Sequence, residues 1–185
     1  MRSLLLVFTM VLPALGGAFN VVHLAGDKEL TIEVSCDKKT QSFTLEAGSD
    51  SGSFTLPEKP AAFRITDSEH KAFSAPASKD GRVLLLYHKD NKPEWHVVPS
   101  QETKETSSLR MINLCDGAVA LTMAEKQYEL KPSQFLDVGA IEKNQVSAQL
   151  DGQKKVSTSA EEPTAFLAVI YPTAEGPQIR FIADR

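Results

Sequence analysis

The residues best suited to chemistry lie around one polar turn in the stretch Arg82–Val98, RVLLLYHKDNKPEWHVV. His88 and His96 flank this turn, and two imidazoles with a carboxylate can hold zinc or copper. Their spacing across a hairpin is not a diagnostic ligand pattern, and a second copy of the stretch has Pro172 and Arg180 at the corresponding places. The pattern therefore favours two solvated surface histidines over a metal site, and it predicts no resident metal or cofactor.

Two aromatic residues in the same stretch are the other candidates for binding. Trp95 is the only tryptophan, and its counterpart in the second copy is Ile179, which favours a place in the core. An exposed tryptophan would instead offer a platform for a sugar ring. Tyr87 recurs as Tyr171, which favours a structural role with the ring against the core. The candidate binding residues are Trp95, Tyr87, His88 and His96.

A serine-containing stretch, Gly48-Ser49-Asp50-Ser51-Gly52, is similar to the Asp-Ser-Gly sequence around the nucleophile of chymotrypsin-like proteases. Such a serine needs a general base within hydrogen-bonding reach and an acid that orients the base. No histidine of the chain stands in an Ala-His-Cys context, and the chain is too short for two six-stranded barrels. The stretch is rich in glycine and serine between two apolar segments, so we expect a turn and no catalytic residue.

The stretch Arg82–Val98 returns near the end of the chain as FLAVIYPTAEGPQIRFI, at Phe166–Ile182. Tyr87 and Tyr171 are each followed by five residues and then by a proline. An internal period of this kind indicates a duplicated structural unit. The other matched segments are Phe19–Leu24 with Leu109–Leu114, Leu30–Val34 with Ala118–Met123, Ser42–Leu45 with Gln127–Leu130, Ser53–Leu56 with Gln134–Val138, and the segment through Phe63 and Ile65 with Val146–Leu150.

Alternation of apolar and polar residues predicts the fold class. Leu30–Val34 (LTIEV) alternates strictly, which is the period of a half-buried strand. No stretch after residue 18 shows sustained apolar residues at helical spacing. We therefore expect an all-β protein with two tandem Ig-like β-sandwich modules that arose by internal duplication. The expected modules are 19–98 and 109–185, joined by a linker at 99–108, and their small cores favour packing of one module on the other.

The first eighteen residues, Met1–Ala18, have the pattern of a secretory signal peptide. Arg2 provides the positive charge, Leu4–Leu12 is apolar apart from Thr9, and small residues precede a cleavage point before Phe19. The apolar run is too short to span a bilayer comfortably, which favours cleavage over a membrane anchor. No later segment is long and apolar enough to span a membrane. We therefore expect a periplasmic or extracellular protein of the cell envelope.

Export permits disulfides, and the chain has two cysteines, Cys36 and Cys115. The two residues do not occupy matching places in the two modules. Two buried, unpaired thiols are therefore favoured over a single bridge between the modules.

The sequence LRMINLCDGAVALTMAEKQYELKPSQFLDVG, with FNVVHL and LTIEV in the first module, resembles the tandem Ig-like domains of surface proteins in the DUF4397 class. The resemblance rests on strand rhythm and covers both modules. The Pro-Asp-Ala turn usual in that class is replaced here by Ala25-Gly26-Asp27 and Cys115-Asp116-Gly117. The resemblance implies a secreted or envelope location and little chemistry.

Two features limit the classes of function that the sequence allows. They are the charge balance and the lack of a convergent acid, base and nucleophile. The formal net charge is -4, so no basic excess attracts nucleic acid. We expect a non-catalytic, exported module that binds another protein, because sandwich edges suit strand addition by a partner. The alternatives are a carbohydrate-binding module that uses Trp95, with polysaccharide as its partner, and a metal-binding protein that uses His88 and His96.

Overall fold

The computed structural model describes residues 18–24, 29–36, 39–52, 54–55, 62–67, 72–76, 81–89, 92–99 and 105–184. This part of the chain consists of strands and connections, with a single-turn 3-10 helix, η1, at Glu142–Asn144. Within it, no helix has the length and apolar character needed to cross a membrane. The predicted all-β class is confirmed. The predicted signal peptide lies outside the described residues except for Ala18, as do residues 100–104 of the predicted linker.

The strands fall into an N-terminal half, β1 to β8, and a C-terminal half, β9 to β16. The first set comprises β1 (Ala18–His23), β2 (Leu30–Cys36), β3 (Lys39–Leu45), β4 (Phe54–Thr55), β5 (Ala62–Asp67), β6 (Ala72–Pro76), β7 (Gly81–Lys89) and β8 (Lys92–Pro99). The second set comprises β9 (Ser108–Asn113), β10 (Val119–Met123), β11 (Lys126–Leu130), β12 (Phe135–Ala140), β13 (Gln145–Leu150), β14 (Val156–Ser159), β15 (Ala165–Thr173) and β16 (Gly176–Asp184).

Within the described residues, the strands form four sheets of four strands each. The N-terminal half contains the orders β3-β2-β5-β6 and β4-β1-β7-β8, and the C-terminal half contains β11-β10-β13-β14 and β12-β9-β15-β16. The strand order in one half becomes that of the other when eight is added to each number. The pairs β1–β7 and β9–β15 are parallel, and the other strand pairs are antiparallel.

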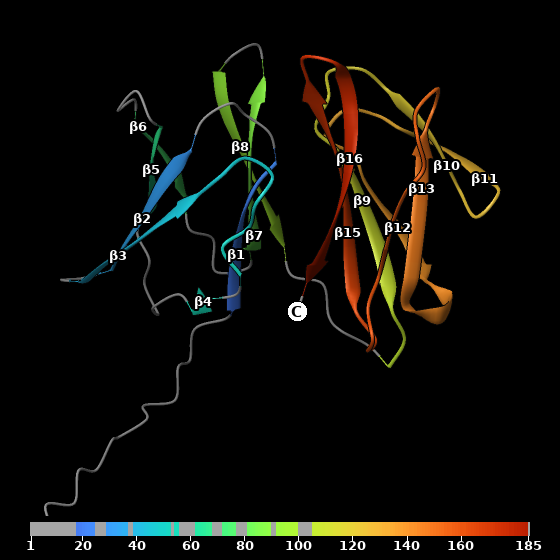
Figure 1. Cartoon of the computed structure of the whole chain (residues 1–185), viewed down its shortest axis with the longest axis horizontal. Helices are drawn as coiled ribbons and strands as arrows, with labels where there is room; N and C mark the ends of the chain where they lie inside the picture. Colours follow the sequence, from blue (N-terminus) through green and yellow to red (C-terminus); the bar gives the residue numbers. More distant parts are fainter. Residues whose placement is uncertain are drawn as a thin grey trace, which may run out of the picture.

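The four sheets are stacked as layers across the molecule (Figure 1). Sheets β3-β2-β5-β6 and β11-β10-β13-β14 are the outer layers, and the other two sheets face each other in the middle (Figure 1). Strands β7 and β15 are in contact across this central boundary. Each half is therefore a two-sheet sandwich, and the two sandwiches are packed on each other.

Alternating residues fill the core between the two sheets of each half. In β2, Leu30, Ile32 and Val34 are buried in the N-terminal core, while Thr31 and Glu33 point to the other face. Residues 83–87 of β7 and 165–171 of β15 are buried without interruption. These two strands have apolar contacts on both faces, which explains why they read as continuous apolar runs rather than as alternating ones.

A third apolar cluster lies between the two halves, and we call it the central cluster. Its members come from the inner sheets of both sandwiches, so the expected packing of one half on the other is observed. Burying such a face stabilises the contact by roughly 25 cal/mol for each Å² removed from water. The buried members are Val22, Leu24, Val83, Leu85, Tyr87, Val98, Ile112, Leu114, Leu167, Val169, Tyr171 and Ile182.

One turn recurs in both halves, after β3 and after β11. In the turns at 46–49 and 131–134, the N–H of the last residue donates to the carbonyl of the first at 3.1 Å. The third residue has a positive φ in both, 77° at Gly48 and 56° at Ser133. A type II turn needs this conformation, which glycine adopts without strain. The turn that we expected in the Gly48–Gly52 stretch is thus found at its start, where Gly48 and Ser49 are the last two residues of the turn at 46–49.

Candidate functional site

The register of β7 and β8 separates the two histidines that were considered as a metal pair. His88 lies opposite Pro93, and His96 lies opposite Leu85. Residues opposite each other share a face, and Leu85 and His88 are three residues apart on one strand, so they lie on opposite faces. The two imidazoles are therefore not brought together. Among the described residues, no three His, Cys, Asp or Glu side chains form a group that could hold a metal ion.

The neighbour of His88 is instead His23, whose ring centroid lies 6.3 Å away. His23 ends β1 and is completely buried. His23 was not among the candidate residues, although its match to Asn113 in the internal repeat indicated a structural role for the position. The Gly48 N–H donates to the His23 carbonyl at 2.9 Å, as the Ser133 N–H donates to the Asn113 carbonyl at 2.7 Å.

Asn113 shows what this position does in the C-terminal half. Its side-chain amide donates to the carbonyl oxygens of Gly117 at 2.8 Å and Leu130 at 2.9 Å. Its Oδ1 accepts from the Cys115 N–H at 2.9 Å. A fully buried amide with these partners satisfies backbone groups that would be costly to bury alone. The residue holds the loop after β9 against the end of β11.

Trp95 is exposed, with 38% of its surface accessible. The predicted core position of Trp95, which was based on Ile179, is therefore wrong. Ile179 itself is only 7% exposed and belongs to the C-terminal core. Strands β13 and β14 lie against β16 in the C-terminal half, which accounts for the burial of Ile179. The first four residues of β8, from Lys92 to Trp95, are all exposed, so this end of the strand lies outside the core.

Tyr87 and Tyr171 occupy the central cluster, one from each half, and both are buried. The expected placement of both rings against apolar core residues is confirmed. Burial raises the pKa of both hydroxyls above the ordinary value. At Tyr87, the negative charge of Glu94 raises the pKa further, whereas Arg180 acts in the opposite direction at Tyr171. Both phenols are therefore neutral at physiological pH.

His96 faces the C-terminal half. It is partly buried, and its ring centroid lies 5.8 Å from that of Phe135. Burial lowers the pKa of the His96 imidazole below its ordinary value, because desolvation disfavours the charged form. The interpretation of His96 as a solvated surface histidine is therefore wrong, and the reason is the packing of the two halves. His88 is also partly buried.

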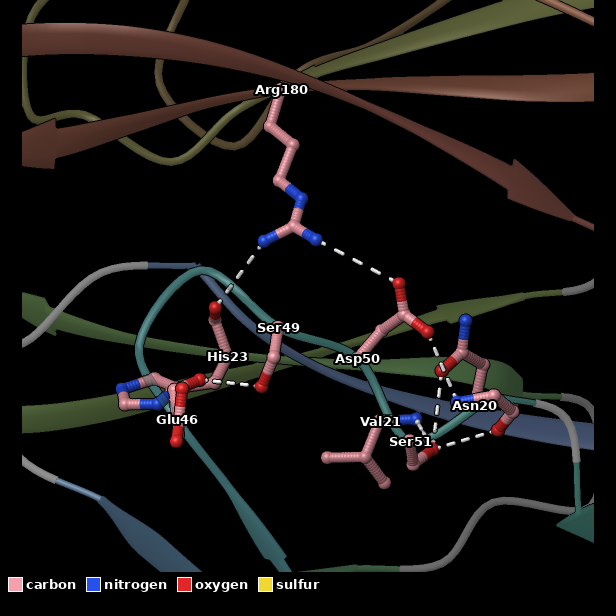
Figure 2. A network of polar contacts seen from close by, with 9 residues as sticks. Asn20, Val21, His23, Glu46, Ser49, Asp50, Ser51 and Arg180 are labelled. Carbon is pink, nitrogen blue, oxygen red and sulfur yellow. Dashed lines mark hydrogen bonds and ion pairs between the residues drawn. The ribbon is translucent and has the colours of Figure 1, made fainter.

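The serines of the loop at 46–52 have structural partners (Figure 2). Ser49 Oγ donates to the Glu46 carbonyl at 2.6 Å. Ser51 Oγ accepts from the Val21 N–H at 2.9 Å and lies 2.8 Å from the Gly52 carbonyl, to which it can donate. The bond from Val21 attaches the loop to β1, and the other two lie within the loop. Both hydroxyl groups are thus used for backbone contacts, which supports the structural interpretation over that of a nucleophile.

The same loop makes an ionic contact with the other half (Figure 2). Arg180 Nη2 lies 3.7 Å from Asp50 Oδ2, and Arg180 Nη1 lies 3.5 Å from the His23 carbonyl oxygen. Lys89 and Asp116 form a second ion pair between the halves. These ion pairs could not be predicted from the sequence, because partners so distant in the chain leave no local pattern.

Cys115 is a free thiol and is only 8% exposed. The bridge to Cys36 that the sequence left open is therefore not formed in this structure. Burial raises the pKa of the Cys115 thiol to about 11, the charge of Asp116 adds to the shift, and Lys89 opposes it. The thiol is therefore an inert part of the C-terminal core rather than a nucleophile.

These features define a layered, all-β protein with an exposed tryptophan at one strand end. The sequence matches no protein-family model and no curated protein sequence. The structural basis for a functional assignment is therefore the exposed end of β8, where Trp95 lies beside exposed Lys92, Pro93 and Glu94.

Proposed function

We propose that the chain is an exported, non-catalytic protein of the periplasm or the extracellular envelope that binds another protein. The exposed end of β8 is the contact surface, and Trp95 is its anchor. The scaffold consists of two Ig-like β-sandwich modules that arose by duplication. The identical strand order in the two halves and the repeated turns at 46–49 and 131–134 support the duplication.

The exposure of Trp95 is the observation on which the proposal depends. Within the described residues, Trp95 and Val156 are the large apolar side chains that are exposed. Tryptophan is among the residues most enriched in the energetic centres of protein interfaces, because one side chain removes a large area from water on binding. The strand that carries Trp95 lies at the edge of its sheet in the described structure. A partner can therefore contact the indole and the strand edge together.

The experiment is site-specific photocrosslinking in the cells that produce the protein. A photoreactive amino acid replaces Glu94, which is exposed next to Trp95, and the control replaces Gln127, which is exposed on the edge strand β11. We expect a protein adduct from position 94, none from position 127, and loss of the adduct when Trp95→Ala is added. An adduct that persists in the Trp95→Ala background would contradict the assigned anchor.

The second candidate is carbohydrate binding, which the same exposure of Trp95 favours, since a sugar ring can stack on an accessible indole. Trp95 is the only tryptophan, so the emission of the whole chain reports on this one site. Titration with a neutral polysaccharide separates the two candidates. A saturable shift in emission supports carbohydrate, and an unchanged spectrum with a protein adduct at position 94 supports the protein partner.

A further inference from the structure

The central cluster is composed of corresponding residues from the two halves. The strand registers give the correspondence: β1 and β7 pair Val22 with Leu85, as β9 and β15 pair Ile112 with Val169. Within the described residues, the buried part of the cluster contains six residues from each half, and every one has its counterpart there. The pairs are Val22 and Ile112, Leu24 and Leu114, Val83 and Leu167, Leu85 and Val169, Tyr87 and Tyr171, and Val98 and Ile182.

The contacts beside the cluster are reciprocal as well. His96 and Arg180 hold corresponding places, since they lie opposite Leu85 and Val169. Asp50 and Phe135 also correspond, because they lie opposite Val22 and Ile112. Arg180 contacts Asp50 of the N-terminal half, and His96 contacts Phe135 of the C-terminal half.

In a twofold interface, residue i of one partner contacts residue j of the other, and j contacts i in return. The two contacts beside the central cluster obey this rule, although the residue types differ: one is an ion pair and the other an aromatic contact. A head-to-tail arrangement of modules would instead place one face of the first against a different face of the second. Both halves contribute the same positions to the central cluster, which excludes a head-to-tail arrangement for the described structure.

We infer that the two halves form an intramolecular dimer about a pseudo-twofold axis, in which each half is the binding partner of the other. The central cluster provides the apolar centre of this interface, and the Asp50–Arg180 and His96–Phe135 contacts fix the orientation at its margin. The two halves therefore associate through these two faces, and the association does not need the covalent connection between them. The inference does not depend on which partner Trp95 binds.

The first test cuts the connection in the full-length chain. A protease recognition sequence inserted within 100–104 allows cleavage after folding, and size-exclusion chromatography with light scattering then measures the mass. We expect the two fragments to elute together as a one-to-one complex of the same size as the uncut chain. Separate elution of the fragments at micromolar concentration would overturn the inference.

The second test asks whether the interface is reciprocal. Leu85→Asp and Val169→Asp place a carboxylate at corresponding central positions, outside the N-terminal and C-terminal cores. We expect either substitution to separate the cut fragments, while circular dichroism of each fragment stays that of β-structure. Separation by only one of the two substitutions, with both fragments folded, would contradict the twofold arrangement.

A milder pair of variants keeps the test decisive if the buried carboxylates prevent folding. Asp50→Arg places two arginines together, and we expect it to weaken the association of the cut fragments about threefold or more. The double variant Asp50→Arg/Arg180→Asp restores the opposite charges and is expected to recover most of the affinity. A double variant that binds no better than Asp50→Arg would show that the two residues do not meet across the interface.

Discussion

At the scale of single residues, packing of the two halves sets the protonation of His96. Its pKa is lowered by burial, whereas in the unfolded chain it titrates near the ordinary value of 6.5. The unfolded state therefore binds the proton more readily than the folded state. The contribution of the neutral, buried His96 to the free energy of unfolding is consequently complete above pH 6.5. It is lost as the pH falls from there through the lowered pKa of the folded protein.

We predict that His96→Gln reduces the loss of stability on acidification. Urea unfolding at about pH 7.5 and about pH 5 measures the difference for the wild type and the variant. The matched control is His88→Gln, which removes an imidazole whose neighbouring ring is His23 of the same half, whereas His96 neighbours Phe135 of the other half. The account fails at this point if the pH dependence disappears in the His88 variant and persists in the His96 variant.

The Cys115 thiol offers a second test at the same scale. Because burial raises its pKa to about 11, the Cys115 thiol is almost entirely protonated at pH 7, and the side chain is buried. In a Cys36→Ser background, we expect no reaction of the folded protein with a chromogenic disulfide reagent. One thiol per chain is expected to react once guanidinium unfolds the protein. Rapid reaction in the folded state would show that the position is open.

At the scale of elements, the two faces of β7 belong to different apolar clusters, one to the N-terminal core and the other to the central cluster. Leu84 belongs to the N-terminal core and Leu85 to the central cluster. We predict that Leu84→Ala lowers the free energy of unfolding of the N-terminal half by about 2–5 kcal/mol. Leu85→Ala should instead weaken the association of the two halves after the connection is cut. Equal effects of both variants on both measurements would contradict the assignment of the two faces.

Alternation in single segments predicted the strands well, because one face of each outer sheet is buried. The two-residue period of Leu30–Val34 is present in the structure, with Leu30, Ile32 and Val34 buried in the N-terminal core.

The match of Ser53–Leu56 to Gln134–Val138 is wrong in register, since Asp50 rather than Phe54 corresponds to Phe135. Short edge strands carry too few apolar residues to fix an alignment, and the shared phenylalanine was misleading.

The candidate site could be predicted only in part. The residue types of Trp95 and Tyr87 identified β7 and β8 as candidate binding strands. The burial of the Tyr87 ring could be predicted because the residue recurs as Tyr171. The exposure of Trp95 could not be foreseen from Ile179, because corresponding positions differ in the strands that cover them. The burial of His96 results from contact with Phe135 in the other half, which no pattern within β8 could indicate.

At the scale of the whole molecule, the proposed export predicts where the mature chain begins. Cleavage before Phe19 would leave Phe19 as the first residue, and this side chain is 1% exposed within the N-terminal core. We predict that N-terminal sequencing of the protein from the periplasm or the medium begins at Phe19. Recovery of the chain with Met1 in the cytoplasmic fraction would contradict the proposed export.

The central claim is that two like sandwiches are packed face to face through the same surface. An experimental structure of the full-length protein tests it most directly, through the rotation that superimposes β1–β8 on β9–β16. The account predicts strand-for-strand superposition by a rotation of about 180°, with Leu85 and Val169 close to the axis. A rotation far from this value, or halves whose strands do not superimpose, would contradict it.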